Sequence, residues 1–163
     1  MRRLALAAVV AAFALAANTS VTFAKDLPAG GLTRQEVLDW LVKHGQKAKL
    51  DYDTVAKDST VTVTSDDGTW SVYFYNCSGE RCKSLQYAAG WNSASVSVAQ
   101  VNDWNNNRRF LRAYKTPSDA VFAEYDVDIN SGTWGALDYS LERWNKQLGV
   151  FRTFLKTGSV PDN

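Results

Sequence analysis

Residues 60–91 alternate between apolar and hydroxyl-bearing side chains over three successive segments. The apolar positions are Val61 and Val63, then Trp70, Val72 and Phe74, and then Leu85, Tyr87 and Ala89. Asp66-Asp67-Gly68 separates the first two segments, and Asp-Gly pairs favour tight hairpin turns. Because successive side chains of a strand point to opposite faces, this pattern predicts an antiparallel sheet with one apolar face.

Cys77 and Cys82 are the only cysteines, and their position between two of these segments fixes a register. If they face each other, the same ladder pairs Phe74 with Leu85, Val72 with Tyr87 and Trp70 with Ala89. Continued through the Asp-Gly turn with Ser65 opposite Trp70, the ladder adds Val63 beside Val72 and Val61 beside Phe74. A slip of one residue would turn these side chains to the other face, so the pattern favours a disulfide at this position.

The first 24 residues are typical of a cleaved secretory signal peptide. Arg2-Arg3 precede an apolar run from Leu4 to Ala17, and Thr22-Phe23-Ala24 offers small residues for cleavage before Lys25. The run is too short for a membrane span, so we expect a periplasmic protein with no stable membrane insertion after cleavage, exported by the general or the twin-arginine route. An oxidising compartment favours a structural disulfide, whereas a redox site would need C-x-x-C and a zinc site more ligands than one His provides.

After removal of residues 1–24, the 139-residue chain carries 16 basic and 17 acidic groups. This length suits one domain, and so balanced a charge argues against a nucleic-acid-binding groove. Residues 25–31 form a short lead-in, residues 32–155 the domain and residues 156–163 a tail.

Three helices are predicted within the domain. Thr33 with Glu36 and Ser97 with Gln100 form capping boxes, which predict helices from there to Gly45 and to about Asn105. The third helix follows from apolar residues at spacings of three and four: Leu137, Leu141, Trp144, Leu148, Phe151 and Leu155. Alternating patterns predict strands over residues 46–52, 60–65, 70–76, 83–91, 109–115 and 121–129. The order α-β-β-β-β-α-β-β-α is that of a single α+β domain with an antiparallel sheet.

Several segments together resemble the YbjN-domain family, over about residues 31–155. They are Cys82–Tyr87, Val101–Asn105, Arg109-Phe110, Arg112–Tyr114, Val121–Ile129 and the last helix with Leu141 and Trp144. The resemblance implies a fold like that of type III secretion chaperones and a role in bacterial sensory transduction. It implies no catalytic residues. The signal peptide and the cysteine pair set this chain apart from cytoplasmic members.

The sheet face opposite the apolar one is the predicted binding surface. It holds Thr60, Thr62, Thr64, Ser71, Tyr73, Tyr75, Ser84 and Gln86, none of them charged. Such a face is ordinary for a solvent-exposed antiparallel sheet, yet tyrosines are also enriched at interfaces. We therefore expect a non-enzymatic module without cofactor or metal, which binds a protein or peptide partner through Thr62, Tyr73, Tyr75 and Gln86.

Two other functions remain open. Glu124, Asp126 and Asp128 project from one face of a strand and would suit a hydrolase or a calcium-dependent enzyme. If Arg112 lies opposite Glu124 and Arg108 opposite Asp128, these acids are instead neutralised by cross-strand pairs. Alternatively, cell-wall glycans would stack on one of the tryptophans that the predicted core does not use: Trp91, Trp104 and Trp134.

Overall fold

The computed structural model describes residues 25–54, 58–65, 68–92 and 94–161. The predicted signal peptide, residues 1–24, lies outside the described residues, as do Asp66 and Asp67 of the predicted turn.

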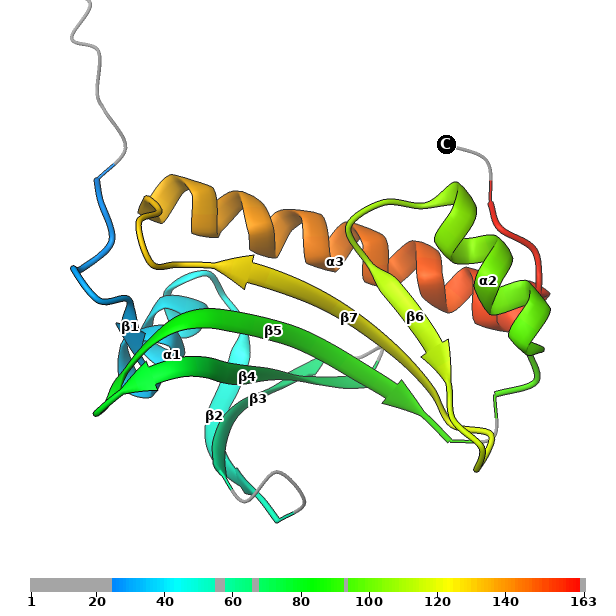
Figure 1. Ribbon diagram of the computed structural model, residues 1–163, viewed down its shortest axis with the longest axis horizontal. Helices are drawn as coiled ribbons and strands as arrows, with labels where there is room; N and C mark the ends of the chain where they lie inside the picture. Colours follow the sequence, from blue (N-terminus) through cyan, green and yellow to red (C-terminus); the bar gives the residue numbers. More distant parts are fainter. Residues whose placement is uncertain (1–24, 55–57, 66–67, 93, 162–163) are drawn as a thin grey trace, which may run out of the picture.

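The described residues form a single α+β domain in the predicted order of elements (Figure 1). The elements are β1 (Leu32–Thr33), α1 (Arg34–Lys43), β2 (Lys47–Asp53), β3 (Asp58–Ser65), β4 (Gly68–Ser78), β5 (Arg81–Trp91), α2 (Val98–Asn107), β6 (Arg112–Lys115), β7 (Val121–Asp128) and α3 (Trp134–Thr157). All strand pairs are antiparallel, in the order β2-β3-β4-β5-β7-β6, and the two-residue β1, which the sequence did not predict, pairs with β5. The strand predicted to begin at residue 109 begins only at Arg112.

The register between β4 and β5 confirms the prediction from the cysteines. Cys77 faces Cys82, Phe74 faces Leu85 and Val72 faces Tyr87. The ladder ends at the pair of Ser71 and Ala88, one residue short of the predicted pairing of Trp70 with Ala89.

The predicted register between β3 and β4 is wrong by two residues. Val61 faces Val72, Val63 faces Trp70, and Ser65 faces Gly68 instead of Trp70. Side chains in a strand repeat their orientation every two residues, so a shift by two keeps the same residues on the apolar face. The apolar pattern therefore fixed the face and left the pairing open.

Both predicted capping boxes are present and set the starts of two helices. The Thr33 hydroxyl accepts from the amide of Glu36, and the carboxylate of Glu36 accepts from the amide of Thr33. Ser97 and Gln100 make the equivalent pair at α2, which ends at Asn107. The third helix continues through Thr157, two residues into the predicted tail of residues 156–163, and Gly158 ends it with φ of +70°.

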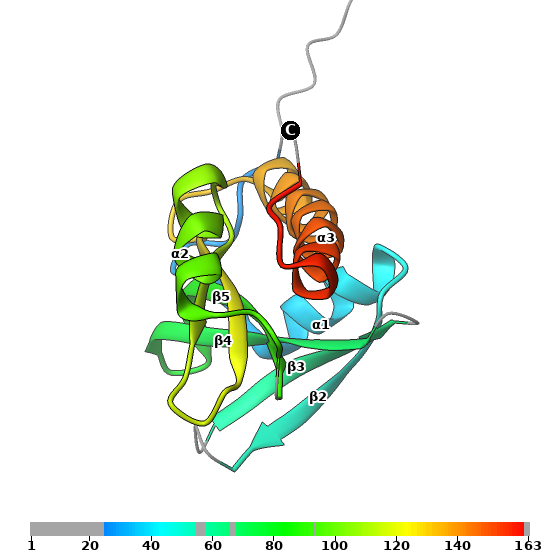
Figure 2. The same ribbon diagram turned by 90° about the vertical axis from the view of Figure 1, so that its right-hand side faces the viewer.

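All three helices pack on one side of the sheet (Figures 1 and 2). Trp144 of α3 lies against Trp70 and Tyr87, with ring centroids 5.6 and 5.9 Å apart. The indole of Trp40 in α1 donates to Asp138 of α3 over 2.8 Å. Figure 2 shows α2 beside the end of α3, where Trp104 packs edge-on against Phe151. We call the opposite side of the sheet the outer face; none of the described helices covers it.

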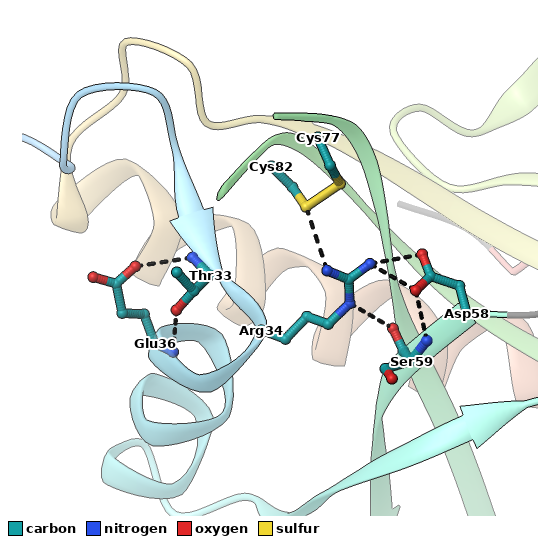
Figure 3. Close-up of a disulfide and its surroundings, with 7 residues drawn as sticks. All are labelled: Thr33, Arg34, Glu36, Asp58, Ser59, Cys77 and Cys82. Carbon is teal, nitrogen blue, oxygen red and sulfur yellow. Dashed lines mark hydrogen bonds and ion pairs between the residues drawn. A yellow bond between two sulfur atoms is a disulfide. The ribbon is translucent and has the colours of Figure 1, made fainter. Parts of the chain in front are cut away.

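The predicted disulfide joins Cys77 to Cys82 at the end of the β4–β5 hairpin (Figure 3). Cys82 is buried, and its sulfur lies 4.0 Å from Nη1 of Arg34, the first residue of α1. The same guanidinium donates twice to Asp58, at 2.8 and 2.6 Å, and once to the carbonyl of Ser59. The disulfide end of the hairpin is therefore tied to α1 and to the start of β3.

Removing this disulfide is expected to lower the free energy of unfolding by about 2 kcal/mol, because the bridge closes only a short loop in the unfolded chain. The double variant Cys77→Ala/Cys82→Ala, compared with the oxidised protein by urea unfolding, measures this loss. Wild-type protein unfolded in the presence of a reductant is the control and should lose a similar amount. An unchanged midpoint in both would show that the bridge adds no stability.

Candidate functional site

Three of the four residues predicted to bind a partner lie close together on the outer face. Tyr73 of β4 faces Gln86 of β5, and the Tyr75 hydroxyl donates to Oε1 of Gln86 over 3.3 Å. Thr62 of β3 lies further along the face, opposite Ser71, and is half-buried. Of the eight residues predicted for this face, Thr60 alone is buried.

A groove of about 280 Å³ crosses the outer face between β4 and the β6–β7 hairpin. Its floor lies on β5, where the outward-facing residues Ala88 and Gly90 have little or no side chain. Tyr73 and Tyr75 line it from β4. Because β5 separates β4 from β7, the backbones of β4 and β7 are about 10 Å apart, twice the spacing of neighbouring strands. We call this cavity the outer groove.

The second wall of the outer groove is formed by Tyr114 of β6 and Phe122 of β7. Their rings are stacked, with centroids 5.4 Å apart and planes at 17°. Gly90 faces Phe122, and a Cβ added at Gly90 would lie 2.8 Å from the Phe122 ring. The absence of a side chain at Gly90 therefore lets this ring lie over the strand. The sequence predictions included neither aromatic residue in the site.

Glu124 lies in the outer groove and is held by three side chains. Arg112 donates to its Oε2 from Nε and Nη2 at 3.1 and 2.5 Å, Tyr114 donates to Oε1 at 3.0 Å, and Gln86 lies 3.4 Å from Oε2. The Glu124 carboxylate is nearly buried, whereas 62% of the Arg112 side chain is exposed. The predicted pair of Arg112 and Glu124 is thus confirmed, both by register and by contact.

The acids of β7 give the outer groove a negative field. Burial raises the pKa of the Tyr75 hydroxyl above its ordinary value, and the charges of Glu124 and Asp126 raise it further against the opposing effect of Arg112. Burial and the hydrogen bond to Glu124 likewise raise the pKa of Tyr114. The hydrogen bond to Glu124 also raises the pKa of Arg112.

The outer face is not uncharged once its neighbouring strands are included. Pairing of β5 with β7 brings Asp128, Asp126 and Glu124 alongside Ser84, Gln86 and Ala88. At the other edge, β2 adds Lys47, Lys49 and Asp51 to the same face. The neutral surface predicted from β3, β4 and β5 is therefore the centre of a face with charged edges.

The predicted pair of Arg108 and Asp128 is wrong. Phe110 has φ of +73°, a conformation that interrupts the strand before Arg112. Arg108 instead follows α2, where its guanidinium lies 5.7 Å from the Trp104 ring and donates to the carbonyl of Pro161. Asp128 accepts from the amide of Asn130.

Each of the three acids accepts hydrogen bonds from groups of the chain itself. Glu124 accepts from Arg112, Asp126 accepts from Gln86 over 2.8 Å, and Asp128 accepts from the amide of Asn130 in the turn that follows β7. Within the described part of the chain, no three His, Cys, Asp or Glu side chains are placed to hold a metal ion.

The three tryptophans proposed for glycan binding differ in exposure. Trp104 is fully buried and donates to the carbonyl of Leu111, so it offers no surface for a sugar. Trp91 is half-buried against Phe151. Trp134 is half-buried and lines a separate cavity of about 570 Å³ beside His44.

Replacing Glu124 by glutamine is expected to destabilise the protein by about 1–3 kcal/mol, because several donors lose a charged acceptor in a nearly buried position. The pKa of Tyr114 should fall at the same time, since the charge of Glu124 is one of the causes that raise it. Urea unfolding and an alkaline titration of tyrosine absorbance measure the two effects. Asp126→Asn is the matched control: Asp126 is exposed, so less than about 0.5 kcal/mol is expected. Equal losses of stability in the two variants would show that the contacts of Glu124 contribute no more than those of the exposed Asp126.

Among the described residues, no helix combines the length and the hydropathy that crossing a membrane requires.

Comparison with known proteins identifies the family. Neither a curated protein nor a solved structure matches the chain, so the likeness to type III secretion chaperones stays a prediction. The model of the YbjN family, whose description reads "Putative bacterial sensory transduction regulator", matches residues 33–156, and the chain therefore belongs to that family.

Proposed function

We propose that this protein is an exported, non-enzymatic regulatory module that binds a protein partner through the outer face of its sheet. The observation that carries the proposal is the outer groove, an aromatic-walled cavity at the centre of a face that no described helix covers. The description of the family, which is that of a regulator and not of an enzyme, supports the same function.

The composition and size of the outer groove favour a protein over a free small molecule. Tyrosine is enriched in protein interfaces and among the residues that contribute most to their affinity. Pockets for small ligands usually enclose about 300–1,000 Å³. At about 280 Å³, the groove lies at the lower limit of this range and has room for one or two side chains of a larger partner.

The periplasmic setting is part of the proposal. The signal-peptide pattern of residues 1–24 and a disulfide of the kind that persists in oxidising compartments support it. Mass spectrometry of the protein recovered from periplasmic extract should give a chain that begins at Lys25 and has no free thiols. A chain that retains residues 1–24, or two free thiols, would contradict this setting.

Capture of partners from the native host tests the binding surface. The double variant Tyr73→Ala/Tyr75→Ala should lose a partner that the wild-type protein retains after crosslinking, and the purified partner should bind the variant at least tenfold more weakly. Tyr139→Ala is the control, because Tyr139 is an exposed tyrosine on α3, away from the outer face. Circular dichroism establishes that both variants fold. If every captured protein binds the double variant as well as the wild type, the outer face is not the binding surface.

A further inference from the structure

The aromatic walls of the outer groove meet an excess of negative charge. Glu124 lines the groove, Asp126 lies beside it and accepts from the lining residue Gln86, and the guanidinium of Arg112 binds Glu124. Arg112 is committed to Glu124 by two hydrogen bonds. Asp126 is exposed, accepts only the neutral amide of Gln86, and forms no ion pair with any of the described residues. Asp126 is thus the carboxylate here that has no direct ion pair among the described residues, although the charge of Arg112 is close enough to act on it.

Aromatic rings beside an unpaired carboxylate match the chemistry that recognises a cationic side chain. The faces of tyrosine and phenylalanine attract ammonium and guanidinium groups through the ring quadrupole. Tyr73 and Tyr75 stand on one side of the groove, and the stacked pair of Tyr114 and Phe122 on the other. Between them, the small side chain of Ala88 leaves the space in which a side chain would lie, next to the Phe122 ring that lies over Gly90.

We propose that the outer groove holds one basic side chain, a lysine or an arginine, of the partner protein. The existence of that partner rests on the function proposed above. The alkyl part of the side chain would pack between the aromatic walls, and its charged end would lie near Asp126. Burial is the main cause that raises the pKa of Tyr75, and the smaller contributions of the Glu124 and Asp126 charges support this direction of charge complementarity.

Titration with short peptides tests the proposal directly. The probes are capped pentapeptides of sequence Gly-Gly-X-Gly-Gly, in which X is lysine, arginine, norleucine or glutamate, added to isotope-labelled, disulfide-bonded protein and followed by NMR. Lysine and arginine should shift the signals of Tyr73, Gln86 and Phe122 and bind roughly threefold to thirtyfold more tightly than norleucine, which has a similar alkyl chain without the charge. Glutamate should cause no shifts in the groove.

Two variants separate the effect of the Asp126 carboxylate on peptide binding from the effect of the overall charge of the protein. Asp126→Asn should remove the preference for lysine over norleucine. Asp51→Asn, which makes the same change in net charge at the β2 edge of the face, should keep it. Equal binding of lysine and norleucine, equal effects of the two variants, or shifts confined to another surface would each overturn the proposal.

The peptide titration and the capture experiment test the two proposals separately, so either proposal can be wrong while the other stands. If partner capture depends on Tyr73 and Tyr75 but basic peptides do not bind the groove, the basic anchor is wrong and the proposed function stands. If basic peptides bind the groove but no captured partner depends on it, the cation site stands and the proposed function is wrong.

Discussion

Replacing Gly31 by alanine is expected to destabilise the protein by about 3 kcal/mol or more. Gly31 has φ of +90°, a backbone conformation that costs a residue with a side chain about 1–2 kcal/mol. An added Cβ would also lie 1.9 Å from the carbonyl oxygen and 2.7 Å from the carbonyl carbon of Cys82. These are backbone atoms of β5 and cannot rotate away, so overpacking adds a further cost of about 1–3 kcal/mol.

The damage should spread beyond residue 31 because several contacts depend on this close approach. The next residue, Leu32, is fully buried and pairs with Cys82, and the carbonyl of Gly31 accepts from Arg81 over 2.7 Å. Moving the backbone at Gly31 would therefore pull β1 away from β5.

Two glycine variants separate these causes, with urea unfolding as the measurement. Gly45→Ala tests the conformation alone, because Gly45 has φ of +77° and an added Cβ there meets nothing within 4 Å; it should cost about 1–2 kcal/mol. Gly149→Ala lies in α3 with equally open space and should stabilise the protein by about 1 kcal/mol. If Gly31→Ala costs no more than Gly45→Ala, Gly31 does not approach Cys82 as closely as described.

Replacing Trp144 by alanine is expected to cost about 3–5 kcal/mol of stability, the usual range for removing a large aromatic side chain from a core. Trp144 is fully buried in α3 and packs edge-on against Trp70 and at a tilt against Tyr87. The loss would be a large share of the 5–15 kcal/mol that stabilises a typical domain. It should also loosen the contact by which α3 covers the inner face of the sheet.

Trp144→Phe is the matched variant and should cost clearly less. The indole nitrogen of Trp144 is buried and has no hydrogen-bond partner among the described residues, so phenylalanine keeps an aromatic ring and loses no hydrogen bond. Urea unfolding of both variants gives the comparison. A cost for Trp144→Phe equal to that of Trp144→Ala would show that the indole makes a contact other than packing.

The features that could be predicted from the sequence depend on neighbouring residues. The capping boxes at Thr33 and Ser97 are local hydrogen-bond patterns, and both helices begin where these patterns place them. The disulfide fixed the register of β4 and β5 because its two sulfur atoms have to meet. No disulfide joins β3 to β4, and the register predicted there differs by two residues from the observed one. The same residues still lie on the apolar face.

The outer groove could be predicted only in part, because it depends on which distant strands become neighbours. Tyr73, Tyr75 and Gln86 were predicted together since β4 and β5 form a hairpin. The other wall comes from β6 and β7, which follow α2 in the chain, and β7 inserts between β5 and β6 in the sheet. Alternation did place Phe122 on the same side of its strand as Glu124, but nothing in the sequence set that strand beside β5.

Site-specific photocrosslinking in the native host tests most directly whether the outer face meets the partner. A photoreactive phenylalanine derivative placed at position 75 lies in the outer groove, whereas the same residue at positions 98 and 139 lies on exposed sites of α2 and α3. A discrete adduct from position 75, with none from positions 98 and 139, is the predicted result. Adducts from the helical positions and none from position 75 would contradict it.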